Sequence, residues 1–256
     1  MIPKIVHYCW FGGQDLPEVE QSCINSWKKL LPDYEFKRWD ESSIDLCEFP
    51  YMKEAYDNKK YAFVSDVVRM IALVEEGGIY LDTDVKLLSS LNAFLTDDAF
   101  CGYENRSNIG TAIIGAVDHF PLFEEMINYY KSHHFVLEDG SFDQTTNVQI
   151  LSRLLDARGY VRKNEEALVD GLHIYERHLF YPKKQRDGSF DINSECVAVH
   201  FGSGSWLTER ERRRGESLLW RNIARPALRK CRSTIVLFMG ESFSRKFEAA
   251  LRKRLR

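Results

Sequence analysis

Asp82 and Asp84 are the side chains of this sequence whose types and spacing are best suited to chemistry. They follow the apolar run Ile79-Tyr80-Leu81, which is long enough for a short buried strand. On an extended chain, residues two positions apart point to the same side, so both carboxylates can contact one cation. Carboxylate and phosphate oxygens together suit Mn²⁺ or Mg²⁺, and the pattern therefore predicts a metal site that also binds a nucleotide diphosphate.

A second polar group, Ser65, Asp66 and Arg69, lies in an otherwise apolar segment that begins at Tyr61. Apolar residues recur there at helical spacing, which predicts a helix with one buried face. Asp66 and Arg69 are three positions apart, so they share a face and can pair. An exposed ion pair worth about 0.3–0.5 kcal/mol is the alternative. We favour a role in a nucleotide site at the carboxyl end of a sheet, because Ser65 and the dicarboxylate segment lie beside the pair.

The elements that must position these side chains follow from glycines and periodicity. Gly77 and Gly78 are expected to end the central helix, since glycine accepts the left-handed conformation of a helix C-cap. Strands and helices alternate along the chain, which predicts an α/β fold with a parallel sheet covered on both faces. The strands are expected at 2–10, 34–39, 79–81, 100–103, 111–117, 172–181 and 196–201, with turns over 85–95. The other helices are expected at 16–31, at 119–130 and from the segment 141–146 to residue 157.

Length and composition are typical of a soluble globular protein. The chain has 256 residues, of which 44% are hydrophobic and 29% charged. Its net charge of −3 is uneven: residues 221–256 hold eleven Lys or Arg against two Glu, a net +9, which leaves −12 for the residues before them. We therefore expect a folded domain over 1–215 and a basic amphipathic helical tail over 216–256.

A cytoplasmic location is the expectation. The N-terminal sequence MIPKIVHYCWFGG has neither a basic region nor a long apolar stretch, so it is not expected to be a signal peptide. No run of the sequence approaches the ~20 apolar residues of a membrane span. The six cysteines show no CxxC and no regular spacing, which favours reduced thiols over a disulfide framework.

Three motifs carry a resemblance to a known family: IPKIVHYCWFGG at the start, YAFVSDVVRMIALVEEGGIYLDTDV in the middle and HFGSGSW at 200–206. In this order they resemble the DXD-motif sugar transferases of glycosyltransferase family 32, the type of capsular polysaccharide and lipopolysaccharide synthesis. The middle motif is specific because the helix, the double glycine and the DTD must coincide. The resemblance implies a GT-A fold, a Rossmann-like mixed sheet flanked by helices. It also implies a Mn²⁺- or Mg²⁺-dependent, retaining transfer of a hexose from a nucleotide sugar.

The resemblance assigns roles to individual side chains. Asp84 would ligate the metal directly, and Asp82 would contact the ribose or sugar while sharing the metal. His200 would be a further ligand of the metal or the diphosphate. Asp66 and Arg69 would hold the hydroxyls and the phosphate side of the donor sugar. The other donor-site residues that the resemblance implies are Tyr61 and Ser65 in the pocket wall, Trp10 stacked on the base, and Ser205 and Trp206 over the diphosphate.

Four further residues are candidates for sugar or acceptor contacts. Asn108 and Thr111 lie in and after a glycine-flanked turn, and Asp143 and Gln144 open an expected helix. Asp143 could serve only as a helix N-cap, and Trp10 could belong to the core. No carboxylate nucleophile is evident beyond the metal and sugar ligands, so front-face substitution is the expected route to retention.

The expected function is hexosyl transfer, with UDP-galactose or another UDP-hexose as donor and a glycan or lipid-linked oligosaccharide as acceptor, in bacterial surface polysaccharide synthesis. A non-catalytic nucleotide-sugar- or carbohydrate-binding protein is the first alternative. A DxD phosphatase is the second, but that class expects a small residue and Thr after the motif, where Val85-Lys86 stands.

The basic tail is expected to hold the enzyme at the inner face of the plasma membrane. Apolar residues at 235–239 flanked by Arg and Lys give an amphipathic cationic surface. Each basic residue near anionic lipid contributes about 1 kcal/mol of attraction. A solvated extension or an oligomer contact is the alternative. Nucleic acid is not expected as a partner, because the basic stretch lacks interleaved aromatic residues and the rest of the chain is acidic.

Overall fold

The computed structural model describes residues 1–185, 187–202 and 217. The chain divides into two units, Met1–Ser203 and Gly204–Arg256, and the fold given below is that of the first. The expected domain boundary at 215/216 and the basic tail lie outside the described residues. Ser205 and Trp206 lie outside them as well, so their contacts with a diphosphate stay predictions.

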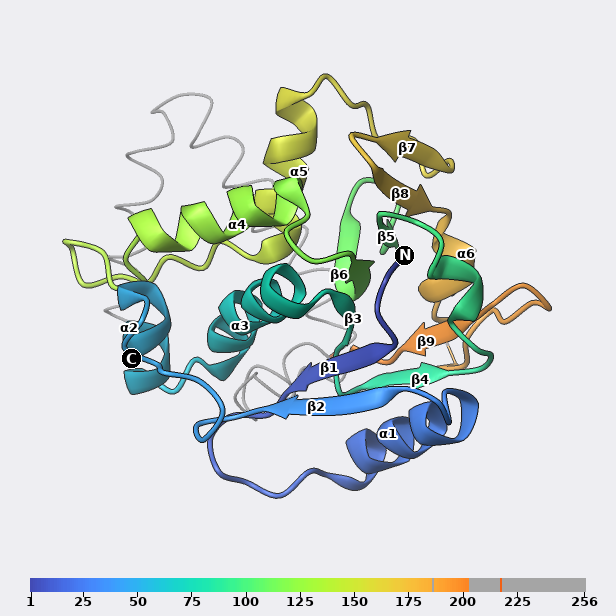
Figure 1. Cartoon of the computed structure of the whole chain (residues 1–256), viewed down its shortest axis with the longest axis horizontal. Coiled ribbons are helices and arrows are strands. Elements are labelled where there is room, and N and C mark those ends of the chain that lie inside the picture. The colour runs from blue at the N-terminus through green and yellow to red at the C-terminus, as the bar shows by residue number, and fades with distance from the viewer. Residues whose placement is uncertain (186, 203–216, 218–256) are drawn as a thin grey trace. The chain divides into compact units, whose positions relative to one another are not determined.

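A seven-stranded sheet forms the centre of this unit (Figure 1). Its strands are β1 (Ile5–Cys9), β2 (Glu35–Trp39), β3 (Gly78–Leu81), β5 (Ala99–Tyr103), β6 (Ile109–Ala116), β7 (Ala167–Val169) and β8 (Leu172–Tyr175). They lie in the order β2-β1-β3-β6-β5-β8-β7. The β1–β2, β1–β3 and β5–β8 pairs are parallel, whereas β6 runs antiparallel to both β3 and β5. The Rossmann-like mixed sheet is confirmed, and the expectation of a parallel sheet is wrong.

The direction of β6 has a local cause. Only residues 104–108 connect β5 to β6, and a connection this short joins antiparallel neighbours. The Glu104 N–H donates to the Asn108 carbonyl oxygen at 2.9 Å and closes the turn. All residues of β6 are buried, so this strand crosses the middle of the sheet.

A two-stranded antiparallel sheet pairs β4 (Val85–Leu87) with β9 (Ala198–His200). The expectation of turns over 85–95 missed β4, although the strand alternates buried Val85, exposed Lys86 and buried Leu87. Val85 pairs with His200, so a residue near the end of the described chain lies beside the DTD segment.

Helices cover both faces of the seven-stranded sheet (Figure 1). One core includes residues of α1 (Glu18–Leu30) and α6 (Arg177–Phe180), and the other includes residues of α2 (Pro50–Asp57), α3 (Tyr61–Glu76), α4 (Pro121–Ser132) and α5 (Asn147–Ala157). In β3, Ile79 and Leu81 enter the first core and Tyr80 the second, as strand alternation requires. The strand expected over 172–181 is too long, because β8 ends at Tyr175 and α6 follows.

The central helix α3 ends as its glycines predict. Gly77 has a φ of +63° and Gly78 a φ of +103°, both in the region that favours glycine. A Cβ on Gly78 would lie 2.7 Å from the carbonyl oxygen of Ile5 in β1. Glycine is therefore required by backbone conformation and by the close approach of the neighbouring strand. This turn directs β3, and the DTD that follows it, along the sheet.

In the described part of the chain, no helix combines the length and the apolar character needed to cross a membrane. Five cysteines there are free thiols: Cys9, Cys23, Cys47, Cys101 and Cys196. Burial raises the pKa of Cys9 to about 12, so this thiol is unreactive at neutral pH.

Candidate active site

Arg69 joins three elements through its guanidinium group. Its Nη1 donates to Thr111 Oγ1 on β6 at 2.7 Å, and its Nη2 donates to Asp82 Oδ1 after β3 at 2.8 Å. The Asp66 carboxylate lies 3.3 Å from Nη1, and the guanidinium carbon lies 4.3 Å from the Tyr80 ring centre. The Arg69 side chain is only 6% exposed, so the alternative of an exposed ion pair is wrong. This guanidinium fixes Asp82 and Thr111 relative to α3.

The DTD segment forms a turn. The Val85 N–H donates to the Asp82 carbonyl oxygen at 2.9 Å, and the Asp82 N–H donates to the Ala112 carbonyl oxygen at 2.9 Å. The extended geometry expected for Asp82 and Asp84 is therefore wrong, since the turn sets the directions of their side chains. The two carboxylates nevertheless come together, with oxygens within 4.8 Å of one another.

His200 completes a group of three ligands with these carboxylates. Its Nε2 lies 3.2 Å from Asp84 Oδ1 and 3.9 Å from Asp82 Oδ2, and one ligand atom from each residue lies within 4.8 Å of the others. Two carboxylate oxygens and one imidazole nitrogen form a donor set that fits a divalent cation such as Mn²⁺. The pairing of β4 with β9 is what places the imidazole here.

The two carboxylates also determine the protonation of His200. Burial by itself lowers the pKa of this imidazole, but the hydrogen bond with Asp84 and the charges of Asp84 and Asp82 outweigh burial, and the pKa is raised. A proton on this imidazole offsets part of the negative charge of the two carboxylates. With a divalent cation held by these three residues, the imidazole would have to be neutral, so its proton would be lost on binding.

Asp66 lies in a different environment on α3. Burial raises the pKa of its carboxyl group to about 6, although the Arg69 charge and a hydrogen bond from the Asn147 N–H lower it. The side chain is 13% exposed. Asp66 is therefore ionised at neutral pH and becomes protonated in mildly acidic solution.

Asn147, the first residue of α5, contacts Asp66 and was not predicted. Its Nδ2 donates to the Asp66 carbonyl oxygen at 2.9 Å, and its backbone N–H donates to Asp66 Oδ2 at 3.3 Å. The Tyr130 hydroxyl donates to Asn147 Oδ1, and both residues are fully buried. The sequence held one signal, the capping box of Thr146 and Gln149 that starts α5. That signal marks the helix start but not its contact with α3.

The residues expected to hold the nucleotide lie in the loop after β1 and in the first turns of α3. Trp10 is half-buried, and its indole N–H donates to the Gln14 carbonyl oxygen at 2.6 Å. The Tyr61 ring occupies the space that a Cβ on Gly12 would need, at 2.5 Å. The Ser65 hydroxyl donates to the Tyr61 carbonyl oxygen at 3.0 Å. Base stacking by Trp10 and donor contacts by Tyr61 and Ser65 stay predictions.

The four candidates for sugar or acceptor contacts lie in different surroundings. Thr111 joins the site through Arg69, whereas Asn108 is exposed in the turn between β5 and β6, and Gln144 is exposed. The Asp143 carboxylate accepts a hydrogen bond from the Tyr129 hydroxyl at 2.8 Å. The N-cap role for Asp143 is wrong, because α5 begins later in the chain. Sugar or acceptor contacts of these residues stay predictions.

The central segment of the chain matches a known protein family. Residues 17–101 match the family described as a glycosyltransferase sugar-binding region containing a DXD motif. This segment of the chain is therefore similar to the DXD-motif glycosyltransferases. The matched segment includes α3, β3 and the DTD turn, and it ends before Thr111, Asn147 and His200.

Several proteins with similar sequences are named as glycosyltransferases. Inositol phosphoceramide mannosyltransferase 3 of Schizosaccharomyces pombe is 31% identical over 134 residues, which are 49% of this chain and 36% of the relative. The chain thus spans about a third of the length of that relative. Uncharacterized glycosyltransferase L373 of Acanthamoeba polyphaga mimivirus is 26% identical over 225 residues, 80% of this chain and 84% of the relative. The solved structure of the PaToxG glycosyltransferase is 20% identical, with a TM-score of 0.46 over 61% of this chain and 70% of that chain.

Proposed function

We propose that the protein transfers a hexose from a nucleotide sugar to a glycan or lipid-linked acceptor, with retention and with Mn²⁺ or Mg²⁺ as cofactor. The observation that carries the proposal is one juxtaposition. The ligand group of Asp82, Asp84 and His200 lies against the Asp66–Arg69 pair, because Asp82 also forms an ion pair with Arg69.

Each side chain then has a task that its surroundings support. When bound, the metal ion neutralises the charge that develops on the departing nucleoside diphosphate. Asp82, Asp84 and His200 would hold it. Arg69 adds a fixed positive charge beside the leaving group and keeps Asp82 in place. The Asp66 carboxylate is placed to accept hydrogen bonds from hydroxyls of the donor sugar.

The proposal also includes the identity of the donor sugar. UDP-galactose or another UDP-hexose remains our first choice. Relatives named mannosyltransferases favour mannose as the second choice, so GDP-mannose belongs among the donors tested. A place in bacterial surface polysaccharide synthesis rests on the resemblance alone. Attachment to the inner face of the plasma membrane rests on the basic tail, and sedimentation with anionic vesicles would test it.

Release of free nucleoside diphosphate from a panel of UDP-, GDP- and CMP-sugars, with and without Mn²⁺, tests the activity without an acceptor. Asp84→Asn removes one ligand charge and is expected to lower metal-dependent release by about 100-fold or more. Asp98→Asn, at an exposed carboxylate, is the matched control and should retain the wild-type rate. Unchanged release in Asp84→Asn would contradict the proposal.

A binding protein that does not turn over its ligand is the alternative. Calorimetric titration of UDP and GDP in the presence of Mn²⁺ distinguishes it. Metal-dependent nucleotide binding without release from any donor, even when glycan acceptors are supplied, would favour the binding protein. Binding together with release of one nucleoside diphosphate would favour the enzyme.

A further inference from the structure

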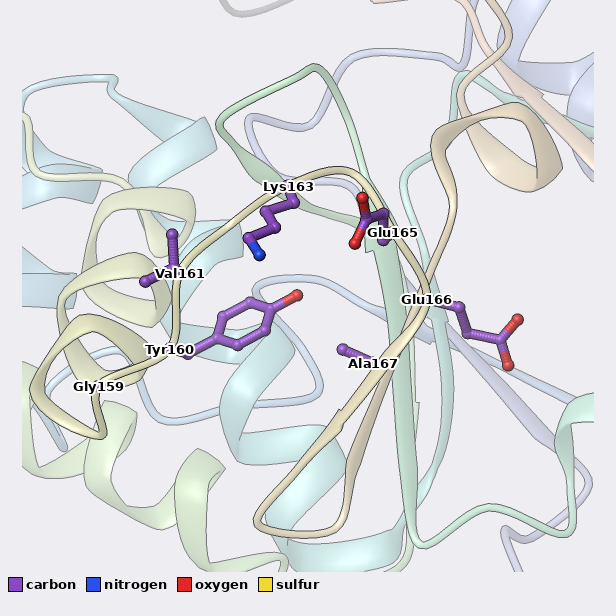
Figure 2. A pocket seen from close by; sticks show the side chains of 7 residues that line it. All are labelled: Gly159, Tyr160, Val161, Lys163, Glu165, Glu166 and Ala167. Atoms are coloured by element: carbon purple, nitrogen blue, oxygen red, sulfur yellow. The ribbon is translucent and has the colours of Figure 1, made fainter.

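A cavity of about 340 Å³ lies at the segment between α5 and β7 (Figure 2), and none of its lining residues belongs to the group of Asp82, Asp84 and His200. It is lined by residues 159–161, 163 and 165–167. The sequence analysis predicted none of these residues as part of a functional site. The volume falls at the small end of ligand pockets, which span about 300–1,000 Å³.

The sheet topology brings this cavity to the edge that carries the DTD. Since β3 and β5 are both antiparallel to β6, they run parallel to each other, and Asp82 and Tyr103 leave the sheet at the same edge. The Tyr103 hydroxyl pairs with the Tyr160 hydroxyl at 2.6 Å and accepts the Lys163 N–H at 3.1 Å. The cavity wall is therefore tied to the end of β5, two strands from the DTD strand.

The same face of the sheet carries both features. Tyr103 belongs to the core that α3 and α5 form, and Arg69 extends from α3 on that side to reach Thr111 on β6. Tyr160 packs against the same core. The cavity and the metal ligands thus both lie at the end of the sheet where β3 and β5 finish.

The side chains of the cavity suit a sugar ring. Figure 2 shows the Lys163 ammonium and the Glu165 carboxylate turned toward the space beside the Tyr160 ring, whereas the Glu166 carboxylate turns away. Glu166 instead lies 2.7 Å from His173 Nε2. An ammonium donates hydrogen bonds to sugar hydroxyls, and a carboxylate accepts hydrogen bonds from them. An aromatic face packs against the C–H face of a sugar.

We propose that this cavity is a subsite for the acceptor glycan, which binds a sugar unit behind the one that receives the transferred hexose. The assignment rests on the proposed function. It predicts that the cavity contributes to acceptor binding and leaves the donor reaction unaffected.

The test uses the full chain and three saccharide probes, methyl α-mannopyranoside, methyl β-galactopyranoside and lactose, with binding followed by saturation-transfer-difference NMR. Wild type is expected to bind at least one probe. Glu165→Gln and Lys163→Ala each remove a charged hydrogen-bonding group and should weaken that binding by about tenfold or more. Glu166→Gln is the matched control and should bind as wild type does.

Metal-dependent release of nucleoside diphosphate is measured in the same four proteins. Equal release in all four, with saccharide binding lost in the two cavity variants, supports the subsite. Release that falls together with binding overturns it, because the two residues would then serve the donor site or the fold. No binding of any probe by wild type overturns it as well. Saccharide binding without nucleotide release in wild type leaves the cavity assignment standing and contradicts the proposed function.

Discussion

Asp66 is an acid whose protonation depends on its burial, and this gives a test at the scale of one residue. Its pKa is raised to about 6 in the folded chain, against about 3.9 when unfolded. Between pH of about 3.9 and about 6, the folded state binds this proton more tightly than the unfolded state does. The contribution of Asp66 to stability is therefore fully present at the acid end of this range and is lost as pH rises through about 6. The free energy of unfolding of wild type minus that of Asp66→Asn should fall by at most about 3 kcal/mol across this window.

Urea unfolding of both proteins at a series of pH values measures that difference. The contributions of the other titrating groups cancel in the subtraction. A difference that stays constant with pH would show that burial does not shift this carboxyl. The sequence predicted the Asp66–Arg69 pair because i,i+3 spacing is local. It could not predict Thr111 or Asn147, whose contacts join residues 42 and 81 positions apart.

At the scale of elements, the α3–β3 turn depends on Gly78. Gly78→Ala places a Cβ 2.7 Å from the Ile5 carbonyl oxygen and also strains a positive φ. We expect a loss of about 2–4 kcal/mol in the free energy of unfolding. Gly140→Ala is the matched control, since its φ is +74° but nothing lies within 4 Å of the added Cβ. Equal losses in the two variants, measured by urea unfolding, would mean that strand contact plays no part.

The same elements show what periodicity can and cannot predict. Helix α3 and its stop were predicted correctly, because apolar spacing and paired glycines are signals within one segment. The antiparallel direction of β6 and the pairing of β4 with β9 were missed, because strand partners are chosen by tertiary packing. The resemblance had named His200, but only the β4–β9 pairing explains why it lies at the DTD.

For the whole molecule, the ligand group links distant parts of the chain, so a bound cation should stabilise the fold. Mn²⁺ at about 100 times its Kd should raise the free energy of unfolding by about 2.7 kcal/mol. His200→Ala should lose most of this gain, whereas His134→Ala, at a largely exposed imidazole, should retain it. Thermal unfolding with Mn²⁺ and with a chelator measures the shift. A gain of the same size in the His200 variant would exclude this histidine as a ligand.

The β4–β9 pair also has a consequence for the order in which the protein is made. Asp82 and Asp84 leave the ribosome well before His200, so a nascent chain has both carboxylates while their third partner is still to be synthesised. A chain that stops at Glu195 lacks β9 but contains every strand of the seven-stranded sheet. We expect such a chain to bind Mn²⁺ more weakly than one that reaches Gly202. The group of three candidate ligands thus becomes complete only when synthesis has passed the last described strand.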